Sequence, residues 1–384
     1  TVASSLGQLG KTSPKVIDAL LLALQDKDED MRRAAANSLG QLGETSPKVI
    51  DALLLALQDE DEYVRCFAAK NLGQLGETSP KVIDALLLAL QDNKFWVQRA
   101  AAESLGQLGE TNPKVIDALL LALLDKYEEV RFAAAGSLGQ LGETSPKVID
   151  ALLLALQDNK PWMQGAAAES LGQLGERSPK VIDALLLALQ DKDEEVRRAA
   201  AESLGQLGET SPKVIDALLL ALLDKDEDMR RAAAYSLGDL GETSPKVIDA
   251  LLLALQDKEY FVRIAAVKSL GQLKIEAEAQ LQPVLIALNR SLHDNDDDVR
   301  GEAYESLRKL LDGLPIPGYR WKPLAKQQKT QKLRLLSLVF VLIGLIGLLF
   351  AFQLPVIAGI VGFIFTVVVG GTQLWLWLKE WWQQ

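Results

Sequence analysis

The sequence is poor in the side chains that carry most enzyme chemistry. Its 384 residues include one cysteine, Cys66, and one histidine, His293. A single thiol cannot form a disulfide within the chain, and its scarcity is typical of proteins from a reducing compartment. A single imidazole excludes histidine-rich metal sites and most histidine-based acid–base pairs. We therefore expect a chain without catalytic residues and without a metal or other cofactor.

Sequence motifs for nucleotide binding and for hydrolysis are missing as well. The sequence contains no G-x-x-x-x-G-K-[ST] phosphate loop and no G-x-S-x-G nucleophile turn. The run Asp294-x-Asp296-x-Asp298 imitates the start of a calcium-binding loop. Such a loop requires glycine at its sixth position, where this sequence has Val299. We interpret the acidic run as a helix cap, since similar runs recur along the chain.

Acidic residues outnumber basic ones, and the two signs are unevenly divided. The formal net charge is −11, yet residues 313–384 hold seven basic residues and one acidic residue. Residues 1–312 hold 34 basic and 51 acidic residues. Because nucleic-acid binding requires a basic surface, we expect no nucleic-acid partner for this long acidic part.

One unit of 33 residues is repeated along most of the chain. The segment P-K-V-I-D-A-L-L-L-A-L occurs eight times without a change of spacing, at Pro14, Pro47, Pro80, Pro113, Pro146, Pro179, Pro212 and Pro245. A ninth, looser copy contains Pro283. No copy is large enough to bury its own apolar surface, so we expect the copies to stack against one another.

Each copy predicts two helices joined by an acidic turn. Ser13 is suited to cap the first helix and Pro14 to begin it, and Gly43 is suited to end the second. Apolar residues, including Leu22, surround nearly all of the first helix, so we expect neighbours on every side of it. The predicted fold is all-α, an α-solenoid of half a repeat and nine repeats over residues 1–311.

The repeat resembles the short bacterial HEAT repeats named after phycobilisome lyases. The pattern P-x-V-x-x-x-L-x-x-x-L-x-D…V-R-x-x-A-A-x-x-L-G is present in residues 179–205. The resemblance implies a ladder in which the turn aspartate pairs with the arginine that follows valine. Matched copy by copy, the pairs are Asp26/Arg32, Asp59/Arg65, Asp125/Arg131, Asp191/Arg197, Asp224/Arg230, Asp257/Arg263 and Asp294/Arg300. Two copies carry Gln98 and Gln164 instead of the arginine.

Relatives with HEAT-like repeats suggest three further interpretations. Deoxyhypusine hydroxylase presents His-Glu pairs to two irons, but Asp294 follows the only histidine here, so that activity is excluded. Some bilin lyases are built of similar repeats, which makes a lyase-like role a minor alternative. The chain begins inside a copy, so we expect it to be the C-terminal piece of a longer protein. Because NACHT-type NTPases carry similar repeats, the chain could be the sensing arm of a signalling ATPase.

Two uncharged segments near the C-terminus predict a transmembrane hairpin. Residues 335–352 and 354–378 carry no charge, and each is long enough to cross a hydrocarbon layer of about 30 Å as a helix. We expect a hairpin over 335–378, with helices at 335–352 and 355–378. Residues 312–334 would be a basic linker and residues 379–384 a cytoplasmic tail.

Basic residues and tryptophans flank this predicted hairpin and indicate its orientation. An excess of lysine and arginine before the first span places both ends, and hence the repeats, on the cytoplasmic side. The residues expected at the membrane interface are Arg320, Lys322, Lys326, Lys329, Lys332, Arg334, Trp375, Trp377, Trp381 and Trp382.

The copies differ mainly along one stripe of the second helix, at the positions of Asp30, Arg33 and Asn37. Offsets of three and seven residues place these positions on one helical face. Neutral drift should have changed Lys15 and Asp18 of the first helix equally, yet their counterparts are constant in eight copies. Aromatic residues and arginine are common in the stripe, as they are at the centres of protein interfaces. We predict partner-binding residues at Tyr63, Trp96, Arg99, Phe132, Trp162, Arg231, Tyr235, Tyr260 and Phe261.

The sequence therefore predicts a membrane-anchored scaffold without catalytic activity. In superhelices of HEAT type the second helices line the concave side, so we expect a protein partner to bind the variable stripe in that groove.

Overall fold

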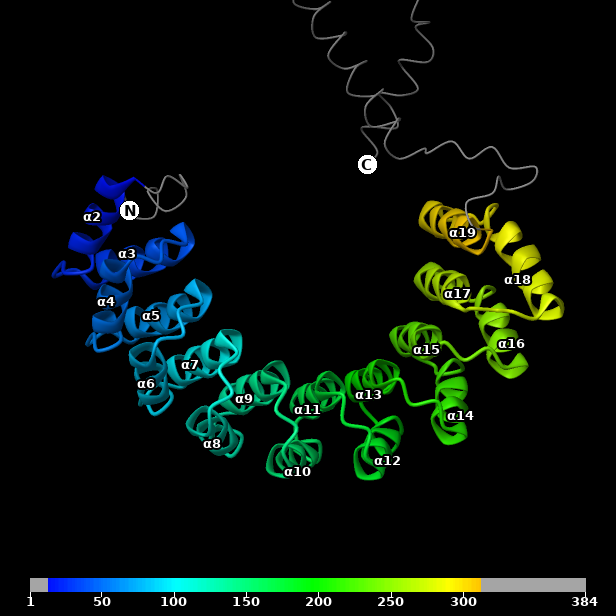
Figure 1. Cartoon of the computed structure of the whole chain (residues 1–384), viewed down its shortest axis with the longest axis horizontal. Helices are drawn as coiled ribbons and strands as arrows, with labels where there is room; N and C mark the ends of the chain where they lie inside the picture. Colours follow the sequence, from blue (N-terminus) through cyan, green and yellow to red (C-terminus); the bar gives the residue numbers. More distant parts are fainter. Residues whose placement is uncertain (1–12, 312–384) are drawn as a thin grey trace, which may run out of the picture. The chain divides into compact units, whose positions relative to one another are not determined.

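Nine helix pairs make up the part of the chain that the computed structural model describes, residues 13–311 (Figure 1). The first helices are α2 (Pro14–Ala23), α4 (Pro47–Ala56), α6 (Pro80–Ala89), α8 (Pro113–Ala122), α10 (Pro146–Ala155), α12 (Pro179–Ala188), α14 (Pro212–Ala221), α16 (Pro245–Ala254) and α18 (Glu278–Ser291). The second helices are α3 (Glu29–Leu42), α5 (Glu62–Leu75), α7 (Phe95–Leu108), α9 (Glu128–Leu141), α11 (Pro161–Leu174), α13 (Glu194–Leu207), α15 (Glu227–Leu240), α17 (Tyr260–Gln272) and α19 (Asp297–Leu310). The predicted all-α solenoid is confirmed for these residues.

Local sequence signals set the ends of the helices. Ser13 Oγ accepts a hydrogen bond from the backbone N–H of Val16, and Pro14 is the first residue of α2. Asp28 caps α3 by accepting a hydrogen bond from the N–H of Asp30. Gly43 follows α3 with a φ of 66°, a left-handed conformation in which a Cβ atom is strained.

Close packing between second helices holds successive pairs together. The second helices of neighbouring pairs contact one another extensively, whereas neighbouring first helices touch at few points. A Cβ atom on Gly172 of α11 would lie 2.8 Å from the Cβ of Ser203 in α13. Ser203 Oγ also donates a hydrogen bond of 2.8 Å to the carbonyl oxygen of Ala168. Glycine and serine therefore let the two backbones approach more closely than larger side chains would allow.

This unequal packing explains where the two kinds of helix lie. Figure 1 shows the odd-numbered second helices along the inner side of the row and the even-numbered first helices along its outer side. Helices on the inner side of a curved row must be closer together than those on the outer side. The small residues of the second helices satisfy that requirement.

The expectation that neighbours surround the first helix is wrong on one side. One leucine of each first helix from α2 to α16 is 59–72% exposed, the row being Leu22, Leu55, Leu88, Leu121, Leu154, Leu187, Leu220 and Leu253. The first helices lie on the outer side of the row, so nothing in residues 13–311 covers the face that points away from the second helices.

No helix within residues 13–311 is both long enough and apolar enough to span a membrane. The predicted hairpin at 335–378 lies outside the described residues, as do the basic linker, the tryptophans around it and the C-terminal tail. The half repeat at the N-terminus, which precedes Ser13, also lies outside them.

Candidate protein-binding surface

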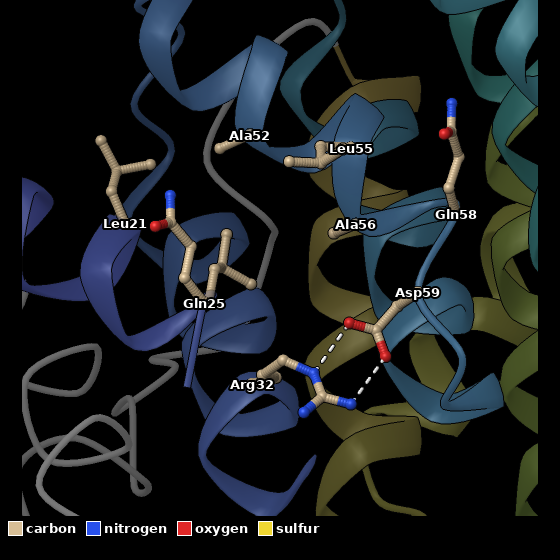
Figure 2. Close-up of a pocket in the computed structure, with 9 residues that line it drawn as sticks. Leu21, Gln25, Arg32, Ala52, Leu55, Ala56, Gln58 and Asp59 are labelled. Atoms are coloured by element: carbon tan, nitrogen blue, oxygen red, sulfur yellow. Dashed lines mark hydrogen bonds and ion pairs between the residues drawn. The ribbon is translucent and has the colours of Figure 1, made fainter. Parts of the chain in front are cut away.

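Arginine–aspartate pairs link each repeat to the next. Arg32 Nε donates to Asp59 Oδ2 at 2.8 Å, and Arg32 Nη2 donates to Asp59 Oδ1 at 2.9 Å (Figure 2). The remaining nitrogen, Nη1, donates to the backbone carbonyl of Asp26 at 3.0 Å. The arginine of the second helix thus binds a backbone carbonyl of the turn in its own repeat and the carboxylate of the turn in the next repeat.

The pairing within single copies that the resemblance implied is therefore wrong. The ion pairs join neighbouring copies, because the guanidinium extends toward the next turn while its own turn offers carbonyl oxygens. They are Arg32–Asp59, Arg65–Asp92, Arg131–Asp158, Arg197–Asp224, Arg230–Asp257 and Arg263–Asp294. Burial alone would raise the pKa of Asp257, but hydrogen bonds from Arg230 and from the N–H of Glu259 hold it below its ordinary value.

The ladder is interrupted in the two repeats that carry Trp96 and Trp162. Gln98 Oε1 is buried and has no hydrogen-bond partner among the described residues. Asp125, which would receive the missing guanidinium, accepts a hydrogen bond of 2.8 Å from the N–H of Tyr127, as Asp59 does from the N–H of Asp61, but within residues 13–311 no arginine pairs with its carboxylate. These two repeats are therefore held to their successors by fewer polar contacts than the others.

Two clefts lie between neighbouring first helices, away from the variable stripe. A cleft of about 420 Å³ between α2 and α4 lies beside Arg32 and Asp59 (Figure 2). A cleft of about 180 Å³ between α10 and α12 lies beside Gln164 and Asp191. Within residues 13–311, no three side chains of histidine, cysteine, aspartate or glutamate are grouped closely enough to hold a metal ion.

All nine predicted partner-binding residues lie on second helices, the inner row of Figure 1. The side chains exposed to solvent are Tyr63, Arg99, Phe132, Trp162 and Tyr260. The side chains that are partly buried are Trp96, Arg231, Tyr235 and Phe261.

Two groups of these residues are in direct contact. Near the N-terminal end, the rings of Tyr63 and Trp96 are stacked, with centroids 5.8 Å apart and an interplanar angle of 6°. The guanidinium of Arg33 lies 4.7 Å from the centre of the Tyr63 ring, a cation–π geometry. Phe95 contacts Trp96 edge-on at 4.8 Å. Sequence reasoning did not select Arg33, although it lies at a variable position, or Phe95, which adjoins one.

The second group lies on α15 and α17. The rings of Tyr260 and Phe261 meet edge-on at 5.3 Å. Arg231 lies 5.8 Å from the centre of the Phe261 ring, and Lys268 lies 5.3 Å from the centre of the Tyr235 ring. Cations of one repeat thus face aromatic rings of the neighbouring repeat.

Phe132 and Trp162, between these two groups, contact no other aromatic ring among the described residues. Their exposed fractions are 46% and 40%, and Lys160 Nζ lies 5.0 Å from the centre of the Trp162 ring. Trp96 differs from Trp162 because its Nε1 is buried without a hydrogen-bond partner in the described part of the chain. Phe132 and Trp162 are thus the exposed aromatic residues of the stripe that do not pack against another ring within residues 13–311.

A row of helix pairs in which each pair completes the apolar core of its neighbours defines an α-solenoid repeat protein. The family model for HEAT repeats matches residues 1–57, 50–139, 116–205, 149–238 and 215–308. The chain therefore belongs to the HEAT-repeat family, and the predicted resemblance is confirmed. No curated protein matches the sequence.

Solved structures share this fold at low sequence identity. Kap95p in complex with RanGDP matches with a TM-score of 0.54 and 14% identity, over 82% of this chain and 48% of Kap95p. YibA of Escherichia coli matches with a TM-score of 0.51 and 21% identity, over 74% of this chain and 97% of YibA. The CpcE–CpcF complex of phycocyanin lyase from Nostoc is 26% identical over 64% of this chain and 96% of that chain, with a TM-score of 0.41. This chain thus spans about half the length of Kap95p, and the likeness to Kap95p and YibA concerns the fold alone.

Proposed function

We propose that this chain is a non-catalytic scaffold that binds a protein partner on the variable stripe and is anchored to a membrane through residues 335–378. The observation that carries the binding proposal is the exposure of Phe132 and Trp162 on second helices, within repeats that are otherwise nearly identical. Large aromatic side chains are common at the centres of protein interfaces, where they supply much of the binding energy. Kap95p, which has a similar fold, binds the protein RanGDP.

The contrast between the two faces of the repeats also supports this proposal. The exposed leucines of the first helices are the same in eight repeats, so they cannot distinguish one region of the solenoid from another. The stripe on the second helices changes charge, size and aromatic character from repeat to repeat. A surface that recognises one partner needs such differences.

Paired substitutions on the two faces test the binding proposal. We expect Phe132→Ala combined with Trp162→Ala to abolish capture of the partner from an extract of the source cells, as measured by mass spectrometry. The control, Leu154→Ala combined with Leu187→Ala, removes exposed apolar surface from the first helices and should leave capture unchanged. The melting temperatures of both double variants should stay within a few degrees of wild type. Loss of capture in the control alone would contradict the assignment.

Trp96 is a poorer choice for this test. Its ring packs on Tyr63 and Phe95, so Trp96→Ala would remove contacts within the protein as well as any contact with a partner. Phe132 and Trp162 make no such ring contacts in the described residues.

The uncharged segments 335–352 and 354–378 support the proposed membrane anchor. The full chain should remain in the membrane fraction after extraction with alkaline carbonate. Leu345→Arg combined with Val367→Arg should release it into the soluble fraction, because a charge near the middle of each span disfavours insertion. Release of the wild-type chain by carbonate would contradict the anchor. If the repeats face the cytoplasm, protease added outside intact cells should leave them uncleaved.

A further inference from the structure

Two repeats of this chain have nearly the same sequence in the turn and the first part of the second helix. They differ at the position of Arg99. Residues 92–104 read D-N-K-F-W-V-Q-R-A-A-A-E-S, and residues 158–170 read D-N-K-P-W-M-Q-G-A-A-A-E-S. The eighth residue is Arg99 in the first repeat and Gly165 in the second. The glutamate four residues later is present in both, as Glu103 and Glu169.

The arginine at this position neutralises the glutamate one turn later. Arg99 Nε donates to Glu103 Oε1 at 2.7 Å. In the repeat that follows the second tryptophan, Arg198 Nη1 donates to Glu202 Oε1 at 3.2 Å. Residues four apart on a helix face one another, so Gly165 leaves Glu169 without this partner.

Glu169 is the glutamate of this series that makes no ion pair in the described part of the chain. No hydrogen bond or ion pair joins its carboxylate to another residue of the described part of the chain, and its side chain is exposed, whereas Glu103 and Glu202 are partly covered. Partial desolvation raises the pKa of Glu169, Arg198 lowers it, and the weaker effects of Glu202 and Glu195 raise it. Arg198 donates its hydrogen bonds to Glu202, so the three carboxylates of Glu169, Glu195 and Glu202 share one guanidinium and leave negative charge in excess.

Two glycines near Glu169, the half-buried Gly136 and the buried Gly165, leave side-chain positions unfilled. A Cβ atom on Gly165 would approach only the Cβ of Ala199, at 3.8 Å, and a Cβ atom on Gly136 would meet nothing within 4 Å. Phe132 and Trp162 occupy equivalent positions to two pairs of residues that are in contact in other repeats. Arg33 and Tyr63 form one such pair, and Arg231 and Phe261 form another. The same register places Phe132 and Trp162 on neighbouring helices beside these two glycines. We name Phe132, Gly136, Trp162, Gly165 and Glu169 the Glu169 patch.

We infer that the Glu169 patch receives an arginine or lysine side chain of the protein partner. Its cation takes the place that Arg99 occupies beside Glu103 in the related repeat, and its methylene groups lie against the exposed rings of Phe132 and Trp162. Charge complementarity favours a basic side chain, because a neutral or acidic one would leave the excess negative charge uncompensated. This inference rests on the proposed function and specifies the chemistry of the partner.

Selection of peptides on the purified full chain tests the inference. Twelve-residue peptides from a random displayed library would be enriched on the wild-type chain, synthesised with a fluorophore and measured by fluorescence polarisation. We expect the binders to require an arginine or lysine, shown by its replacement with alanine. Glu169→Gln and Gly165→Arg should each weaken binding at least tenfold, which corresponds to about 1.4 kcal/mol.

The two variants remove the same charge in different ways. Glu169→Gln keeps the shape of the side chain, and Gly165→Arg supplies the internal partner that Arg99 provides elsewhere. Glu103→Gln is the matched control and should leave peptide affinity unchanged, because Glu103 is already paired. Thermal melting of each variant shows whether the fold is retained.

The outcomes separate this inference from the proposed function. Peptides that lose affinity with Trp162→Ala but not with Glu169→Gln would overturn the inference while leaving the binding stripe in place. Binders without a required basic residue would overturn it in the same way. Peptides insensitive to Trp162→Ala, or a selection that yields no binders, would overturn both.

Discussion

Three glycines in and after α9 lie in different surroundings, and alanine should have a different effect at each. A Cβ atom on Gly136 would meet nothing within 4 Å, whereas one on Gly139 would lie 2.9 Å from the Cα of Ser170 in α11. Gly142 ends the helix with a φ of 70°. We expect Gly136→Ala to stabilise the chain, and Gly139→Ala and Gly142→Ala to destabilise it.

The magnitudes follow from these surroundings. Gly136→Ala should raise the free energy of unfolding by about 0.5–1 kcal/mol, because alanine loses less backbone freedom in a helix interior. At Gly139 the gain from reduced backbone freedom is smaller than the cost of overpacking, which is about 1–3 kcal/mol. The new methyl group there meets backbone atoms of Ser170, which cannot rotate away. Gly142→Ala should lower the free energy of unfolding by about 1–2 kcal/mol, the cost of a left-handed conformation for a residue with a Cβ atom.

Urea unfolding followed by circular dichroism gives the sign of each change. Amide hydrogen exchange in α9 and α11 shows where it acts, since repeats in a solenoid are stabilised mainly by their nearest neighbours. Equal effects of Gly136→Ala and Gly139→Ala would refute the claim that close approach of second helices determines the packing.

Two further predictions concern the polar contacts between repeats. Gln98→Arg should raise the free energy of unfolding by about 1–2 kcal/mol in urea titrations, because it supplies a guanidinium to Asp125, and the gain should disappear in an Asp125→Asn background. The hydrogen bond from Arg33 is the largest of the effects that hold the pKa of Asp61 at about 2, below the ordinary value of 3.8. Because the pKa of Asp61 is lower in the folded chain, its ionised carboxylate stabilises the fold. This contribution is complete above pH 3.8 and is lost as the pH falls through about 2. Amide protection in α3 and α5 should therefore fall over this range in the wild-type chain and change less in Asp61→Asn.

Regular spacing made the helix pairs predictable from the sequence. Proline, the acidic turn and glycine recur at fixed positions, so the ends of most helices followed from local chemistry. The ninth pair departs from this rule, because α18 begins at Glu278, ahead of Pro283, and the proline lies inside the helix. A looser copy gives no such signal for its first residue.

Contacts between repeats were harder to predict, because the sequence pattern is the same in every copy. Arg32 lies at a regular spacing from both Asp26 and Asp59, and only the stacking decides that it binds the carboxylate of Asp59. The exposure of Leu22 likewise depends on the spacing between first helices, which the residues of one helix do not reveal.

In the candidate site, too, features of single repeats were predictable from the sequence and contacts between repeats were not. The variable stripe and its aromatic residues were visible in a comparison of the copies. The stacking of Tyr63 on Trp96 and the lack of ring contacts at Trp162 depend on neighbouring repeats. The unpaired Glu169 had a signal in the sequence, the replacement of Arg99 by Gly165, but its meaning required the contact between Arg99 and Glu103.

Site-specific photo-crosslinking tests most directly whether a protein partner binds the stripe of the second helices. A benzophenone amino acid placed at Phe132 in the full chain, in the source cells, should form covalent adducts with a partner protein. The same group at Leu154, exposed on a first helix, should form none. Adducts from position 154 and none from position 132 would contradict binding on the second helices.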